Sequence, residues 1–201
     1  MTKNDRPAFG FEVLQQDGAA RRGRVTSGFG VVDTPAFMPV GTAASVKAMM
    51  PEQVASTGAQ IILSNTYHLM LRPGPERVER LGGVRKLMGW DGPLLTDSGG
   101  FQVMSLGPLR NISEQGVSFK SHLDGSIFDL TPERSTQIQH MLDATITMAF
   151  DECTPFPATY DEARASMELS MRWAARSRSA YVARTGYGQF GIVQGLSLIH
   201  I

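Results

Sequence analysis

Short apolar runs recur along this chain of 201 residues, and a polar side chain follows all but the first of them. The runs are Ala36 to Val40, Ile61 to Leu63, Leu94 to Leu95, Thr145 to Phe150 and Phe190 to Val193. The polar residues at the ends of the last four are Asn65, Asp97, Asp151 and Gln194. Helix-like stretches separate the runs, at Ser45 to Thr57, Glu76 to about Leu81, Thr131 to about Leu142 and Tyr160 to Arg184. This alternation is typical of parallel β/α units, so the pattern predicts an α/β fold that gathers the four polar groups at one edge.

A closed (β/α)8 barrel of the TIM type and a doubly wound open sheet would both bring these strand ends together. A doubly wound sheet is expected to carry a Gly-rich nucleotide fingerprint after its first strand, and none stands there in this chain. We therefore prefer the barrel. Because such a barrel usually needs about 250 residues, we expect residues 1–195 to be the N-terminal part of a barrel that is incomplete in this chain.

Two segments outside the β/α alternation are predicted to form hairpins. Phe9 to Gln15 and Arg21 to Thr26 flank an Asp-Gly turn, which indicates an N-terminal β-hairpin. Val117 to Leu123 and Ile127 to Leu130 flank a second Gly-containing turn and predict a hairpin inserted after the strand of Asp97.

The residues that follow the third run have the composition of a ligand-binding turn. Asp97 and Ser98 stand directly after the apolar residues, and Gly99 and Gly100 come next. Glycines let the backbone approach a flat ligand or adopt a positive φ, and the ring of Phe101 offers a surface on which such a ligand could stack. The segment predicts a base-binding pocket. An ordinary strand-turn in which Asp97 caps the next helix fits this stretch equally well.

Two carboxylates and two amides around an apolar pocket suit the recognition of a purine. Asp151 can accept hydrogen bonds from ring and exocyclic N–H groups, while Gln194 and a backbone N–H can donate to a carbonyl, and this set complements guanine. Asp97 could remove or return a ring proton if burial raised its pKa. The simpler alternative for Asp151 is a loop acid paired with an arginine.

The composition of the chain further limits the classes of protein and of binding site that it can represent. Nineteen Lys and Arg against nineteen Asp and Glu give no net charge, so bulk electrostatics do not indicate a nucleic-acid partner. The single cysteine, Cys153, excludes an internal disulfide framework and fits a pocket wall better than a nucleophile. His68, His122 and His140 are far apart in sequence, and we expect them to pack or hydrogen-bond rather than to bind metal. No run has the length of a signal peptide core or a membrane span, so we expect a cytoplasmic protein. We also expect this chain to hold no metal or cofactor.

Three arginines of the last helix-like stretch, Arg172, Arg176 and Arg184, could face solvent or a polyanion. We prefer the solvent-facing interpretation, because runs of charge on a helix usually form its exposed side.

Several longer motifs, taken in order, resemble the bacterial tRNA-guanine transglycosylases (queuine tRNA-ribosyltransferases). These motifs are Val40 to Lys47, Ser64 to Leu69, Thr96 to Gln102, Phe119 to Gly125 and Phe150 to Cys153. The resemblance runs from about Phe11 to Gly195. It implies a (β/α)8 barrel that exchanges guanine at the wobble position of certain tRNAs for a 7-deazaguanine precursor of queuosine.

The resemblance also implies roles for residues of this chain. Asp97 matches the aspartate that accepts and returns the proton of the base. The segment Ser98 to Phe101 matches residues that contact and stack on the base, while Asp151 and Gln194 match residues that read its polar edge. The expected substrate-binding set is completed by Gly195 and Asn65. The implied partners are tRNA and guanine or a 7-deazaguanine base, with a homodimer as the full-length assembly.

Two family features have no counterpart in this chain. The covalent nucleophile of the family is a second aspartate on a later strand, and its structural zinc is bound by three cysteines and a histidine further on. We therefore expect this chain to be an N-terminal fragment. Residues 196–201 depart from the family, and one codon choice for them spells the end of a transposase sequencing adapter, so we expect a non-native tail.

Three other functions stay open at this point. An archaeosine-type transglycosylase would act on a different tRNA position. A partner subunit could keep the fold and bind tRNA without catalysis, although the presence of Asp97 and Asp151 argues against it. An unrelated barrel hydrolase could use the same two carboxylates.

Overall fold

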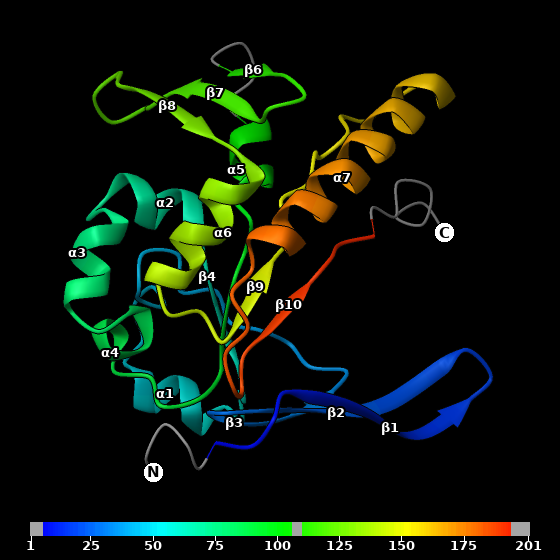
Figure 1. The fold of residues 1–201 in the computed structure, drawn as a ribbon. Coiled ribbons are helices and arrows are strands. Elements are labelled where there is room, and N and C mark those ends of the chain that lie inside the picture. Colours follow the sequence, from blue (N-terminus) through cyan, green and yellow to red (C-terminus); the bar gives the residue numbers. More distant parts are fainter. Residues whose placement is uncertain (1–5, 106–109, 194–201) are drawn as a thin grey trace.

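The computed structural model describes residues 6–105 and 110–193. Four short parallel strands form its central sheet: β4 (Ile62–Ser64), β5 (Leu94–Thr96), β9 (Ile146–Met148) and β10 (Gly188–Phe190). Their order across the sheet, β10-β9-β5-β4, follows the chain, and Val40 adds a parallel bridge to Leu63 of β4 (Figure 1). The predicted parallel β/α arrangement is confirmed. Within the described residues the sheet is open and has two edges.

Two of the predicted strands differ from the observed ones. β10 begins at Gly188, which aligns with Ile146 of β9, so residues 191–193 of the predicted run Phe190 to Val193 lie beyond the strand. The run Ala36 to Val40 contributes only an isolated bridge. Pro39 has no backbone N–H, which prevents this run from completing a regular ladder.

Seven helices accompany the strands in the described part of the chain. They are α1 (Pro51–Ser56), α2 (Thr66–Leu71), α3 (Pro75–Arg80), α4 (Val84–Met88), α5 (Gly100–Met104), α6 (Pro132–Met141) and α7 (Tyr160–Ala180). None of them combines the length and the apolar character that a membrane crossing requires.

The start of α6 follows from its local sequence. Pro132 occupies the first turn, and the hydroxyl of Thr131 accepts a hydrogen bond of 3.1 Å from the backbone N–H of Arg134. Within the helix-like stretch Ser45 to Thr57 the helix α1 begins at Pro51, where the sequence allows a helix to start, and residues 45–50 are not helical. The predicted helix from Tyr160 is confirmed but ends at Ala180 instead of Arg184.

Antiparallel strands form two further sheets. At the N-terminus, β1 (Gly10–Asp17), β2 (Ala20–Ser27) and β3 (Gly30–Thr34) confirm the predicted hairpin and extend it by one strand. Between α5 and α6, the predicted second hairpin is present as β7 (Val117–Lys120) and β8 (Ile127–Leu130), joined by β6 (Arg110–Ile112). Figure 1 shows this inserted sheet above β9, on the opposite side of the molecule from β1 to β3.

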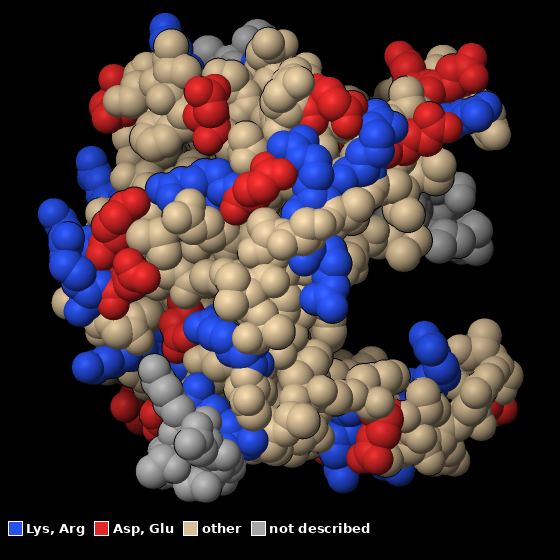
Figure 2. Space-filling view, viewed as in Figure 1, with Lys and Arg blue, Asp and Glu red and all other residues tan. Residues whose placement is uncertain are grey.

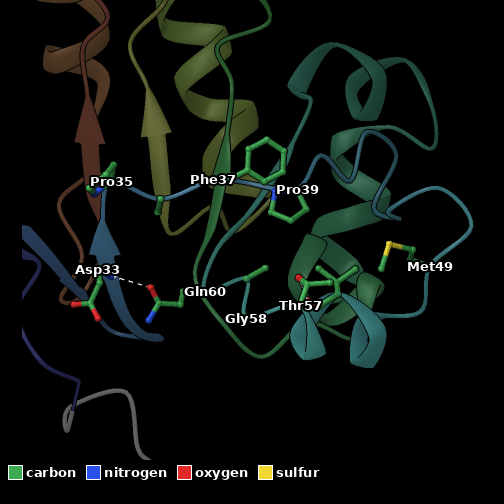
Figure 3. Close-up of a pocket in the computed structure, with 11 residues that line it drawn as sticks. Asp33, Pro35, Phe37, Pro39, Met49, Thr57, Gly58 and Gln60 are labelled. Carbon is green, nitrogen blue, oxygen red and sulfur yellow. Dashed lines mark hydrogen bonds between the residues drawn. The ribbon is translucent and has the colours of Figure 1, made fainter. Parts of the chain in front are cut away.

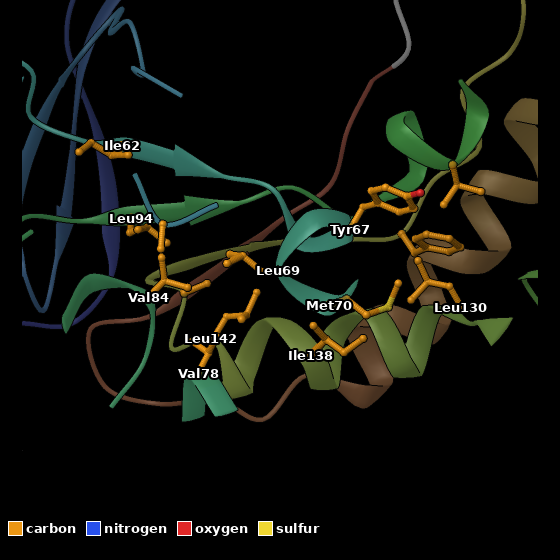
Figure 4. Close-up of a cluster of buried hydrophobic side chains, with 14 of the residues drawn as sticks. Ile62, Tyr67, Leu69, Met70, Val78, Val84, Leu94, Leu130, Ile138 and Leu142 are labelled. Carbon is orange, nitrogen blue, oxygen red and sulfur yellow. The ribbon is translucent and has the colours of Figure 1, made fainter. Parts of the chain in front are cut away.

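Both faces of the parallel sheet are covered. On one face, Ile62 and Leu94 of the strands pack with Ile138 of α6 in a large apolar cluster (Figure 4). On the other face, Leu95 and Ile146 pack with apolar residues of β2 and β3. Parallel strands are usually buried in this way. The carboxyl ends of the strands are therefore where this sheet can present polar side chains.

Candidate active site

Asp97 follows β5 and is held by residues from two other elements. Its Oδ1 accepts a hydrogen bond of 2.8 Å from the backbone N–H of Thr66, at the start of α2. Its Oδ2 accepts from the side chain of Asn65, which follows β4, and from Nε2 of Gln102 in α5 at 2.9 Å. The ends of β4 and β5 therefore meet as predicted. The carboxylate of Asp97 thus reaches the first turn of α2 and also bonds to Gln102 in the following helix α5.

The environment of Asp97 changes its acidity. Burial raises the pKa of Asp97 above that of an ordinary aspartate, although the hydrogen bonds from Asn65, Thr66 and Gln102 act in the opposite direction. A carboxylate with a raised pKa is a stronger base toward a ring N–H of a bound base. The raised pKa of Asp97 therefore suits the proton transfer expected of this residue.

Asp151 follows β9 and lies close to the turn after Asp97. The hydroxyl of Ser98 donates a hydrogen bond of 2.8 Å to Oδ1 of Asp151, whose exposed fraction is only 7%. Gly100 packs so closely that a Cβ at its position would lie 2.5 Å from the backbone oxygen of Asp151. No local sequence pattern indicates the contact between Ser98 and Asp151. Asp151 thus lies against the turn that follows Asp97.

The turn at Gly99 and Gly100 has the backbone geometry that the close contact with Asp151 needs. Gly99 has a φ of +87°, in the left-handed region that favours glycine. Two residues further on, Phe101 has an exposed side chain with 61% of its surface accessible. Its ring is therefore free of the core. Two predicted site residues, Gln194 and Gly195, lie outside the described residues.

The structure brings together two histidines that are distant in sequence. The hydroxyl of Tyr67 lies 2.9 Å from Nδ1 of His122, and the ring centroids of His68 and His122 are 6.4 Å apart. Burial lowers the pKa of His68, with a smaller effect in the same direction from His122. His140 lies apart from them, beside Tyr181, at 5.3 Å between ring centroids. The part of the chain that the structure describes has no group of three His, Cys, Asp or Glu residues suited to a metal ion.

Arg172 is exposed and Arg176 and Arg184 are partly exposed, in line with the solvent-facing interpretation, and each one also forms an ion pair with an acid of another segment. Their partners are Glu114 for Arg172, Glu133 for Arg176 and Asp143 for Arg184, at 2.9, 2.7 and 2.9 Å. Positive and negative side chains are interspersed on the face shown in Figure 2. These arginines are largely neutralised by neighbouring carboxylates and offer no unpaired stripe of charge for a polyanion.

The site residues do not line the cavity in Figure 3. That cavity has a volume of about 570 Å³ and lies between α1 and the segment from Pro35 to Pro39. Its wall includes Phe37 and Met49, and the side chain of Gln60 accepts a hydrogen bond of 2.9 Å from the backbone N–H of Asp33. The cavity borders the sheet edge beyond β4, away from Asp97 and Asp151, and we assign it no part in base binding.

Comparison with known proteins identifies the family. The model of the queuine tRNA-ribosyltransferase family matches residues 16–198. The queuine tRNA-ribosyltransferase of Rickettsia felis (strain ATCC VR-1525 / URRWXCal2) is 64% identical over 187 residues, which cover 93% of this chain and 52% of the relative. Those of Rickettsia bellii (strain RML369-C) and Rickettsia akari (strain Hartford) are 63% and 62% identical over the same coverage. The chain thus spans about half the length of the curated relatives it matches. With most of its length matched by the family model, this chain belongs to the queuine tRNA-ribosyltransferase family.

Proposed function

We propose that the full-length protein exchanges guanine at the wobble position of tRNA for a 7-deazaguanine precursor of queuosine. The observation that supports this most directly is that Asp151, which follows β9, bonds to Ser98, the residue next to Asp97 at the end of the neighbouring strand β5. A purine has polar groups along its edge and a flat apolar face. A buried acid for the edge and an exposed ring for the face are both present, in Asp151 and Phe101.

Each residue then has a defined role. Asp151 accepts hydrogen bonds from the N–H groups of the base, and Gln194 with Gly195 reads its carbonyl side. Asp97 gives a proton to the ring nitrogen of the departing guanine and takes one from the incoming base, so it ends each exchange in its initial state. The ribose is held meanwhile by the nucleophilic aspartate of the missing half. Asn65 lies against Asp97 and belongs to the same pocket.

A direct test measures the exchange of labelled guanine into tRNA by the full-length protein and by its Asp97→Asn variant. Removal of the proton acceptor is expected to lower the rate by about 10²-fold or more. Asp91→Asn serves as a matched control, because Asp91 is exposed and stands before β5, at the opposite end of that strand from Asp97. Full exchange by a folded Asp97→Asn variant would exclude the proposed role. No exchange by the wild type would favour a tRNA-binding subunit without catalysis.

We further propose that the missing half closes the sheet into a (β/α)8 barrel. The strands already follow one another in chain order, and both edges are available: β10 on one side and the segment around Phe37 on the other. Phe37 is 83% exposed, beside the cavity in Figure 3. Met167 and Met171 are exposed on α7, where the helix of the next unit would pack. A full-length structure with these three side chains still exposed would contradict the closure.

The chain as given is expected to differ from the intact protein. It lacks the nucleophile, so we expect no guanine exchange from these 201 residues. Its open sheet edges favour aggregation, and a sharp melt of a monomer would contradict that expectation. The structural zinc, the homodimer and most tRNA contacts belong to the missing half in this proposal, and a tRNA substrate implies a cytoplasmic location. We also propose that residues 196–201 are a non-native tail, which resequencing of the locus would test.

A further inference from the structure

A single glutamine of α6 connects the strands that bear the two acids. Gln139 is fully buried, with 0% of its surface exposed. Its Nε2 donates to the backbone oxygen of Met148 at 2.9 Å, and its Oε1 accepts from the backbone N–H of the same residue at 2.7 Å. Oε1 also accepts from the hydroxyl of Thr96 at 3.0 Å. Both polar atoms of the carboxamide are therefore used, as a buried amide requires.

The carboxamide of Gln139 makes the hydrogen bonds that a residue of a neighbouring strand would make. The pairing between β5 and β9 ends at Thr96 and Thr147, because the chain after Thr96 turns away into the segment of Asp97. The next residue of β9, Met148, would then have a backbone N–H and C=O without a strand partner on this side. Gln139 binds both groups at once, as a peptide unit of a neighbouring strand would.

The same network reaches the other side of Asp97. Nε2 of Gln139 donates to the hydroxyl of Ser135 at 3.2 Å, and that hydroxyl donates to the backbone oxygen of Ser98 at 2.7 Å. Thr96 and Ser98, the two neighbours of Asp97, are thus both fixed to α6. Met148, three residues before Asp151, is fixed to the same helix. Fully satisfied buried networks of this kind make a structure rigid.

We propose that Gln139, assisted by Ser135, is a positioning residue that sets the separation of Asp97 and Asp151 for the base. Gln139 touches neither the base nor either carboxylate, and it acts through the backbone on both sides of the gap. The proposal rests on the proposed function, because the acids must share one ligand for their separation to matter. A flat ligand bound from two strand ends tolerates little change in that separation, since a displacement of about 1 Å can cost 10²-fold in rate.

The test compares Gln139→Met, Ser135→Ala and Thr136→Val in the full-length protein. Thr136 is a matched control: it is equally buried on α6, but its hydroxyl bonds only to the backbone oxygen of Pro132 in the same helix. Guanine affinity is measured by calorimetry, and KM for guanine and kcat are measured by exchange into tRNA. Thermal melts establish which variants are folded at the assay temperature.

We expect Gln139→Met to weaken guanine binding by about tenfold or more, Ser135→Ala by a smaller factor, and Thr136→Val by less than about twofold. A purely structural role would lower the melting temperature and leave the affinity of the folded protein unchanged, and that result for Gln139→Met overturns the proposal. If Gln139→Met does not fold, Ser135→Ala decides by the same criterion. A wild-type protein that binds no guanine would instead overturn the proposed function.

Discussion

The close approach of Gly100 to Asp151 leads to a specific prediction for the change Gly100→Ala. A Cβ on Gly100 would lie 2.5 Å from the backbone oxygen of Asp151, 3.2 Å from its Oδ1 and 3.3 Å from the hydroxyl of Ser98. Gly100 does not have a positive φ, so alanine adds no backbone strain there. The effect of the substitution therefore arises mainly from the contact with Asp151.

The size of the effect follows from how far the two segments must separate. An ordinary Cβ contact begins at about 3.4 Å, so the gap must open by about 0.9 Å from the 2.5 Å available. Asp151 cannot move freely, because the backbone N–H groups of Phe150 and Glu152 on either side of it donate to the hydroxyls of two serines in α7. Overpacking at such a site costs about 1–3 kcal/mol of unfolding free energy.

Urea unfolding and guanine calorimetry of the full-length protein measure the two consequences of Gly100→Ala. We expect a lower unfolding midpoint and guanine binding weaker by about tenfold or more, since Asp151 is displaced. Gly10→Ala is the control, because a Cβ on Gly10 meets nothing within 4 Å and its φ is not positive. Wild-type stability together with wild-type guanine affinity in Gly100→Ala would refute the reasoning that these two segments are in contact.

Three further predictions concern stability and are measured on the full-length protein. Trp173→Ala removes a fully buried indole and should cost about 3–5 kcal/mol in urea unfolding. Thr159→Ala removes the capping box that Thr159 forms with Glu162 at the start of α7, and should cost about 1 kcal/mol in the same assay, whereas Thr159→Ser should retain most of that stability. Glu133 has a pKa lowered from 4.5 to about 2, chiefly by its hydrogen bond with Arg176, so its contribution is complete above pH 4.5 and lost as the pH falls toward 2. Glu133→Gln should flatten the pH dependence of stability in that range, and because the pair is partly exposed the change at neutral pH should stay below about 1 kcal/mol.

The elements with a strong local signal were predictable from the sequence. The apolar runs before Asn65, Asp97 and Asp151 lie in the central sheet because their order and spacing suit parallel β/α units. The start of α6 was predictable because Thr131 and Pro132 act on the first turn alone. Short helices such as α2 and α4 were not, since five or six residues contain too few turns for a periodic pattern to appear.

The sequence could point to candidate site residues but not to the contacts between them. Asp97 and Asp151 could be identified because each ends an apolar run, but the hydroxyl of Ser98 that links them acts across 53 residues of sequence. Gln102 and Gln139 could not be identified as partners of the strand ends, because nothing in a local pattern distinguishes a glutamine that faces the sheet from one that faces solvent. The ion pairs of the arginines in α7 were missed for the same reason.

The sequential order of the central strands bears on how this protein is made on the ribosome. Each strand of the central sheet pairs with the strand of that sheet that precedes it in the chain: β5 with β4, β9 with β5, and β10 with β9. A nascent chain can therefore add strands one at a time to a sheet that has already emerged, without waiting for the C-terminal half. Gln139 of α6 emerges before Met148, so the group that caps the end of β9 is available when that strand arrives. The contacts around Asp97 and Asp151 can thus begin to form while later residues of the chain are still being synthesised.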